Sequence, residues 1–133
     1  EGRSFADRNY GESNRKVNYE LVPYAVFSQP EIASVGMTEE KAEQLIGKDN
    51  FIVYRSSFRP LSKSIPRKGS KCILKLIVDK NNNTILGCHM LGENASEIIQ
   101  MASISLILGA KKSDFDKTMA LHPTIAEEFV TMT

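Results

Sequence analysis

Hydrophobic and polar positions divide the chain into a polar start and a patterned remainder. Residues 1–20 carry few apolar side chains and predict a tail or linker. Apolar and β-branched residues then gather in short runs that predict strands, at 21–27, 32–37, 51–58, 71–79 and 84–91. The last two runs flank Asn81–Asn83, and because asparagine tolerates left-handed backbone conformations, they predict a hairpin.

A different spacing follows the last strand. Asn94 and Glu97 resemble a capping box that begins a helix over 98–108, which Gly109 ends. That helix is apolar on nearly all sides, so we expect it to be buried or packed against another subunit. Further short helices are expected at 39–46, at 113–116 and from Thr124 onward.

This order of elements predicts an α+β fold, with an antiparallel β-sheet and helices packed on one face. Composition agrees, because 41% hydrophobic and 25% charged residues are typical of a globular domain. The net charge of +1 is too balanced for a protein that binds nucleic acid through phosphates. No apolar run approaches the ~20 residues of a membrane span. We therefore expect neither nucleic acid nor a membrane as a partner.

Positive charge is nevertheless concentrated in one stretch. Between Arg55 and Lys75 there are seven basic residues and no acid: Arg55, Arg59, Lys63, Arg67, Lys68, Lys71 and Lys75. Such a stretch is either a solvated hairpin loop or an attraction for an anionic substrate.

Cysteine and histidine are scarce. Cys72 and Cys88 form no Cys-x-x-Cys pair, so they predict free buried thiols and a reducing compartment: the cytoplasm, or an organelle stroma or matrix. His89 lies in a predicted strand, where a structural or surface role is expected. Two histidines without clustered acids predict no metal site. The start at Glu1, without a signal-peptide pattern, predicts a piece of a longer protein.

The segment Leu-His-Pro-Thr-Ile-Ala-Glu-Glu-Phe carries the clearest chemistry. His122 precedes Pro123, which favours an extended backbone, and Glu127 lies about one turn into the helix expected from Thr124. A carboxylate on one ring nitrogen fixes the tautomer of a general acid–base histidine. Thr124 and Glu127 also fit a capping box. Both interpretations stay open, because Glu128 or the Thr124 hydroxyl can satisfy the helix end while Glu127 binds His122.

Several segments resemble one family. LHPTIAEEFVTM resembles the C-terminal HPTxxEE signature of the flavin-dependent pyridine nucleotide–disulfide oxidoreductases, and VPYAVFSQPEIASVGMTEEKA, ILGCHMLGENASEIIQ and the initial EGR resemble other segments of it in the same order. The resemblance covers about Val22 to Met132. Within the family, the EEFVTM ending and Ser-Phe-Arg-Pro-Leu are most similar to glutathione reductases of bacteria and plastids; dihydrolipoamide dehydrogenases and mercuric reductases are the alternatives.

The resemblance implies a domain assignment. Residues 1–20 would end a preceding flavin domain, and residues 21–133 would form the C-terminal dimerisation, or interface, domain. The parent would be a homodimeric disulfide reductase that uses FAD and NADPH to reduce glutathione disulfide. In the family, both cofactors and the redox disulfide belong to preceding domains, so we expect no cofactor on this piece alone and no activity from it.

The resemblance also implies roles for individual residues. His122 would act as the acid–base catalyst in the partner subunit's active site, with Glu127 hydrogen-bonded to it. The backbone at His122 and Pro123 would approach the partner's flavin. Substrate-binding positions would be Thr124, Glu128, Phe58 and Leu61. The alternative is a dimerisation module without a catalytic role, in which His122 and Glu127 belong only to a capped helix end.

Overall fold

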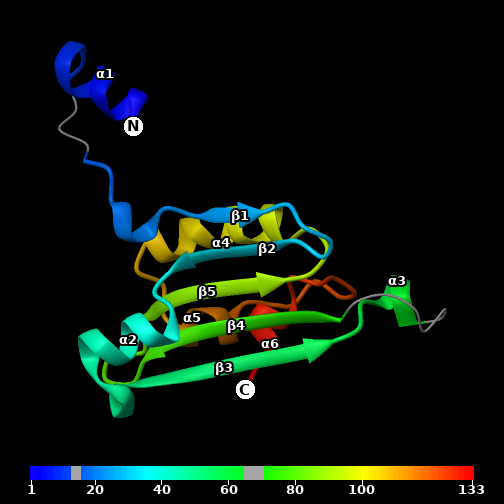
Figure 1. Cartoon of the computed structure of the whole chain (residues 1–133). Helices are drawn as coiled ribbons and strands as arrows, with labels where there is room; N and C mark the ends of the chain where they lie inside the picture. Colours follow the sequence, from blue (N-terminus) through cyan, green and yellow to red (C-terminus); the bar gives the residue numbers. More distant parts are fainter. Residues whose placement is uncertain (13–15, 65–70) are drawn as a thin grey trace.

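The structure, a computed structural model, describes residues 1–12, 16–64 and 71–133. Five strands form one antiparallel sheet in the order β1-β2-β5-β4-β3 (Figure 1). Their bounds are Tyr24–Val26 for β1, Ile32–Gly36 for β2, Phe51–Phe58 for β3, Cys72–Asp79 for β4 and Ile85–Leu91 for β5. The predicted strands are therefore present, although the first is shorter than the apolar run that predicted it.

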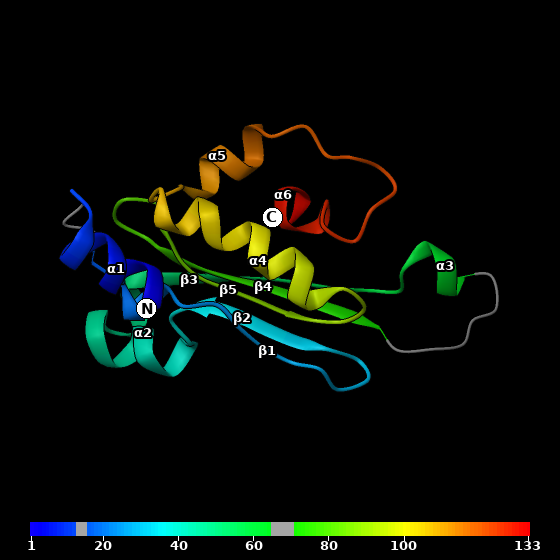
Figure 2. The same cartoon turned by 90° about the horizontal axis from the view of Figure 1, so that it is seen from above.

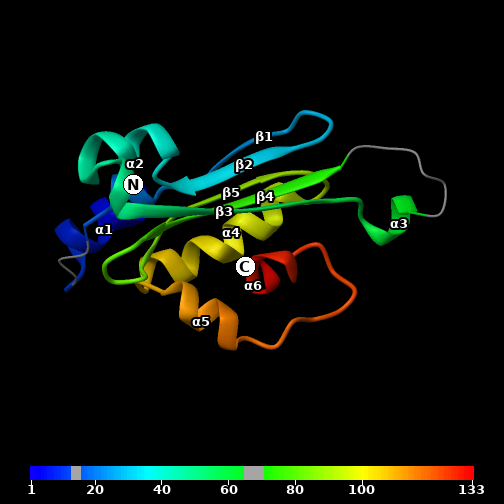
Figure 3. The same ribbon diagram turned by 90° about the horizontal axis from the view of Figure 1, so that it is seen from below.

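Three helices cover one face of this sheet, as Figures 2 and 3 show: α4, Ala95–Ile107; α5, Lys112–Lys117; and α6, Glu128–Thr131. Helix α2, Glu39–Ile46, lies at one end of the opposite face. The α+β class predicted from the sequence is confirmed. Because strand side chains alternate between faces, the apolar positions of β2, β4 and β5 meet the helices on one side.

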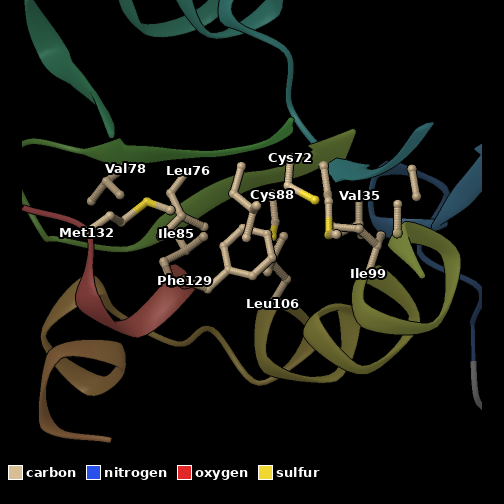
Figure 4. Packing of buried hydrophobic residues seen from close by; sticks show 14 residues of the cluster. Val35, Cys72, Leu76, Val78, Ile85, Cys88, Ile99, Leu106, Phe129 and Met132 are labelled. Carbon is tan, nitrogen blue, oxygen red and sulfur yellow. The ribbon is translucent and has the colours of Figure 1, made fainter. Parts of the chain in front are cut away.

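The core lies between the sheet and α4, and α6 closes it at the C-terminus (Figure 4). Its members are apolar side chains from β2, β4, β5, α4 and the end of the chain, including Val35, Leu74, Leu76, Cys88, Met90, Ile99, Leu106, Phe129 and Met132. Each fully buried large side chain contributes about 1.5–3 kcal/mol. Cys72 and Cys88 are free and buried, as predicted, and burial raises the pKa of both thiols.

The β4–β5 hairpin also has the predicted turn chemistry. Asn83 adopts a left-handed backbone with φ 65°. Its side-chain oxygen accepts a hydrogen bond from the Ser113 backbone N–H at 2.8 Å, which ties the turn to α5. Asparagine here satisfies both the backbone geometry and the start of a neighbouring helix.

Residues 1–20, predicted to be a tail or linker, contain regular structure in the part that the structure describes. Helix α1 spans Gly2–Tyr10, and a short 3-10 helix spans Tyr19–Leu21. The Tyr19 hydroxyl donates to Glu1 Oε1 at 2.8 Å and links the two pieces. Helix α1 stands apart from the sheet (Figure 1), so no apolar stripe facing this core marks it in the sequence.

The sequence between the strand runs 51–58 and 71–79 predicts a loop over 60–69, and this segment is partly helical. Helix α3, Leu61–Ser64, follows β3 directly, and the Ser64 hydroxyl donates to the Pro60 carbonyl at 3.1 Å. The rest of that predicted loop lies outside the described residues. A second 3-10 helix, Lys48–Asn50, joins α2 to β3.

The predicted capping box at Asn94 was wrong as well. Asn94 has φ 61° and its side chain makes no capping hydrogen bond, so α4 begins at Ala95. The carboxylate of Glu31, from the β1–β2 connection, instead accepts from the Ser96 backbone N–H at 3.1 Å and from its hydroxyl at 2.8 Å. These two bonds, the backbone one first, lower the pKa of Glu31. The N-terminal cap comes from a distant residue, which local sequence spacing does not reveal.

Candidate functional site

The segment between α5 and α6 presents the predicted chemistry. Residues 118–127 extend toward the end of the sheet at which β3 finishes and α3 lies (Figures 1 and 2). Met119, Leu121 and His122 are exposed along it. Phe129 and Met132 are buried in the core directly afterwards (Figure 4). The loop is therefore open to its surroundings while its C-terminal end is fixed.

His122 and Glu127 form the contact that the sequence predicted. His122 Nδ1 lies 2.9 Å from Glu127 Oε1. The histidine side chain is 80% exposed, whereas the glutamate side chain is 14% exposed. Because a carboxylate only accepts, Nδ1 carries the hydrogen. The imidazole is thus held through one nitrogen, while most of the ring is exposed.

A contact in the turn before α6 does not compete with this pair. Thr124 Oγ1 accepts from the Glu127 backbone N–H at 3.1 Å. The capping box predicted for Thr124 and Glu127 was wrong: α6 begins only at Glu128, and its N-cap residue, Glu127, has no side-chain capping hydrogen bond. The Glu127 carboxylate binds the imidazole of His122 instead.

One atom of the pair lacks a partner within the chain. Glu127 Oε2 is buried, and no donor reaches it from the residues that the structure describes. Buried polar atoms are hydrogen-bonded in the large majority of cases, and exceptions occur at catalytic sites. One oxygen of this carboxylate therefore binds His122, and the other is buried without a donor among the described residues.

The other predicted site residues are dispersed. Glu128 Oε2 accepts from the Ser56 hydroxyl of β3 at 2.6 Å, so one oxygen of that carboxylate is bound to its own sheet. Phe58, at the end of β3, is half-buried and packs against the core. Leu61 is exposed at the start of α3. Pro123 is exposed beside His122, to which a cis peptide bond joins it. Thr124, Glu127 and His122 are brought together by hydrogen bonds. Phe58 and Leu61 lie apart from them in the sequence, at the end of β3 and the start of α3.

Three residues of the basic stretch, Arg55, Lys63 and Lys75, pair with acids from elsewhere in the chain. Glu39 of α2 binds both Lys75, at 2.7 Å, and Arg55, at 2.6 Å. The hydrogen bond from Lys75, followed by that from Arg55, lowers the pKa of Glu39. Lys63 pairs with Glu93 at 3.0 Å. Arg67 and Lys68 lie outside the described residues. For these three residues, the pairs favour a structural role over an attraction for substrate.

The second histidine has a structural position. His89 Nε2 lies 2.9 Å from the Met37 carbonyl and Nδ1 lies 2.9 Å from the Ser34 hydroxyl. Because a carbonyl only accepts, Nε2 carries the hydrogen and Nδ1 accepts from Ser34. Burial, the largest cause, lowers the pKa of His89. His89 therefore joins β5 to β2 and to the connection before α2.

Within residues 1–12, 16–64 and 71–133, no group of three metal-ligating side chains occurs. Over the same ranges, no helix has the length and apolar character needed to cross a membrane. Ser56 and Glu31 were missed by sequence analysis. The only signal for Ser56 was its place on the same strand face as Tyr54 and Phe58, which pack against the core.

Comparison with known proteins places the chain in a family. The model of the pyridine nucleotide-disulphide oxidoreductase dimerisation domain matches residues 22–133. Over 132 residues the chain is 46% identical to a glutathione reductase of Nostoc sp. (strain PCC 7120 / SAG 25.82 / UTEX 2576) and 42% identical to one of Burkholderia cepacia. It is also 42% identical, over 132 residues, to the chloroplastic/mitochondrial glutathione reductase of Pisum sativum.

These alignments cover 99% of this chain but only 29%, 29% and 24% of the three relatives. Among solved structures, the HOCl-induced flavoprotein disulfide reductase RclA from Escherichia coli matches with a TM-score of 0.82 and 26% identity, over 98% of this chain and 30% of that one. The fold, the His-Pro-Thr loop and these matches lead to one conclusion: the chain belongs to the pyridine nucleotide–disulfide oxidoreductase dimerisation domain family.

Proposed function

We propose that this chain is the interface domain of an NADPH-dependent, FAD-containing glutathione disulfide reductase. It supplies dimerisation and an acid–base histidine to the partner subunit's active site. The observation that carries the proposal is the His122–Glu127 pair, in which a buried carboxylate orients an exposed imidazole. The similarity to glutathione reductases, at 42–46% identity, supports the choice of disulfide. The buried thiols support a reducing compartment, the cytoplasm or an organelle stroma or matrix.

The proposed chemistry needs a proton at a defined place. When a protein thiolate attacks one sulfur of glutathione disulfide, the sulfur–sulfur bond breaks, a mixed disulfide forms, and half of the substrate leaves as a thiolate. A free cysteine thiol has a pKa of about 8.5, so protonation favours its release at neutral pH. His122 Nε2 gives that proton, while Nδ1–H stays bound to Glu127. Its imidazolium form also stabilises the remaining protein thiolate.

The cofactors fit the parent rather than these residues. The sequence has no G-x-G-x-x-G segment and no pair of cysteines four residues apart, and Cys72 and Cys88 are buried in the sheet. When bound, FAD in this family would transfer two electrons from NADPH to a protein disulfide. The exposed His122 and Pro123 are the residues of this chain that would lie against a partner's flavin. The disulfide site would be lined by Thr124 and Glu128, together with Phe58 at the end of β3 and Leu61 at the start of α3.

Helix α4 supports the homodimer. One side of it is buried against the sheet through Ala95, Ile99, Ser103 and Leu106. The other side is apolar too, yet exposed, and carries Met101, Ile104, Ile107 and Leu108. An apolar helix face of this kind is typical of an interaction surface. A second copy pairing through the same face would form an isologous dimer, the commonest oligomer of soluble proteins.

The test is a chimera in which this chain replaces the matching segment of the Nostoc glutathione reductase. Replacing His122 by Ala should lower glutathione-disulfide-dependent NADPH oxidation by about 10²–10⁴-fold, because general acid–base catalysis contributes that much. Met119→Ala, an exposed residue of the same loop, is the control and should leave activity unchanged. A loss of only a few fold in H122A would favour a dimerisation module without a catalytic role.

A further inference from the structure

The C-terminal segment has few attachments to the sheet. Helix α6 has only four residues, and the loop before it is mostly exposed. Phe129 and Met132 bury their side chains in the core, which fixes the helix by apolar contact. Because apolar contact is non-directional, it holds α6 against the core but restrains the rotation of this helix less. A short helix also has little rigidity of its own.

One hydrogen bond supplies the missing direction. The Ser56 hydroxyl donates to Glu128 Oε2 at 2.6 Å, across 72 positions of sequence. Among the hydrogen bonds of the described residues, it is the one that joins α6 or the 118–127 loop to the sheet. Its length lies in the range of charge-assisted hydroxyl–carboxylate bonds, which are about twice as strong as neutral ones.

Ser56 is supported by its neighbours in the sheet. It lies third from the end of the edge strand β3 and pairs with Leu74 of β4, which is fully buried. Tyr54 and Phe58, two positions to either side, pack against the core from the same strand face. The hydroxyl that binds Glu128 is therefore flanked by side chains that are themselves held by the core.

We infer that Ser56 is a positioning residue for the His122–Glu127 pair. The inference rests on the proposed function. Glu128 follows Glu127 directly, so fixing the Glu128 carboxylate against β3 fixes the first turn of α6 and the direction in which Glu127 points. Glu127 in turn holds the imidazole at 2.9 Å. Catalytic groups need placement within about 0.5 Å and 10–20°, and Ser56 contributes that precision from outside the site.

This assignment also changes the interpretation of Glu128. One of its oxygens is committed to Ser56, so Glu128 acts first as the anchor of α6. Ser56 itself lies on the helix-covered face of the sheet and is not expected to touch the disulfide. Its loss should therefore lower kcat through misplacement of His122, while KM changes little. Direct loss of a substrate contact would raise KM instead.

The experiment compares four proteins: the unchanged chain, Ser56→Ala, Ser56→Thr and Ser57→Ala. Ser57→Ala is the matched control, because it removes the same hydroxyl from the next, exposed position of β3. The first readout is the ¹⁵N signals of the His122 ring in the 133-residue chain, which report where its hydrogen sits. The second is kcat and KM of the same variants in the Nostoc chimera. Thermal unfolding of each variant verifies that it is folded.

Ser56→Ala should reduce the share of the Nδ1–H form of His122 and lower kcat by about tenfold, within the 10²-fold that a 1 Å misplacement can cost. Ser56→Thr should restore both, since it keeps the hydroxyl. If Ser56→Ala and Ser57→Ala give the same ring signals and the same kcat, the inference is overturned, and a large H122A effect would still uphold the proposed function. If H122A leaves activity intact, the proposed function fails, and the ring signals alone judge Ser56.

Discussion

The two histidines of the chain lie in regions with opposite characters. His89, in the middle of the sheet, has both ring nitrogens hydrogen-bonded inside its own chain. His122 has one nitrogen bound to Glu127 and the other at the surface. The ring of His89 is fully paired within the chain, whereas the 118–127 loop leaves apolar side chains exposed and Glu127 Oε2 without a donor among the described residues. The comparison teaches that two histidines of one chain can differ in how far the chain itself satisfies their surroundings, completely for His89 and only on one side for His122.

The largest contrast should appear in stability when the same substitution is made in each region. Leu76→Ala removes a side chain that is 0% exposed, and Leu121→Ala removes one that is 75% exposed. The first should lower the free energy of unfolding by about 2–5 kcal/mol because it opens a core cavity. The second should change it by less than about 0.5 kcal/mol. Urea denaturation measures both free energies of unfolding. Equal losses in the two variants would contradict the difference between the two regions.

A second experiment tests whether the exposed apolar face of α4 takes part in dimerisation. Ile107 and Leu45 are each 60% exposed near the ends of α4 and α2. Ile107→Asp should weaken dimerisation of the chimera by about tenfold or more, since a buried charge in an apolar interface costs more than 1 kcal/mol. Leu45→Asp should leave the dimer intact. Light scattering over a range of concentrations gives the mass. A dimer unaffected by Ile107→Asp would move the interface away from this face.

The smallest expected effect concerns pH. The pKa of His89 is lowered by burial below its usual 6.5, so the folded state resists a proton that the unfolded state accepts. Stability is therefore highest above pH 6.5 and decreases as the pH falls through that value toward the lower folded pKa. Urea denaturation between pH 7 and pH 5 should show this decrease, and His89→Gln should flatten it.

Other groups around His89 act in a separate range. Lys75, Glu39 and Glu40 are its charged neighbours. The pKa values of Glu39 and Glu40 lie below 4.5, because of hydrogen bonds from Lys75 to the first and from the Glu40 backbone to the second. Their titration falls below the pH window of the experiment. A slope that persists in His89→Gln would assign the pH dependence to groups other than this imidazole.

What the sequence predicted was local. The hairpin followed from apolar runs around Asn81–Asn83, and the His122–Glu127 contact joins residues five positions apart. The features that were missed are long-range: Glu31 binds Ser96 across 65 positions, and Ser56 binds Glu128 across 72. Single-sequence patterns record neighbours along the chain, whereas these partners become neighbours only through the sheet. The fold class was therefore predictable, and the support of the site was not.

The carboxylate that Glu31 lends to α4 has a consequence for the order of assembly. The first turn of a helix is the costly one to form, because several residues are fixed for one hydrogen bond. Here the Glu31 carboxylate, in the connection between β1 and β2, accepts from the Ser96 backbone N–H in the first turn of α4. The helix and this edge of the sheet should thus become stable together, and neither is a fully independent folding unit.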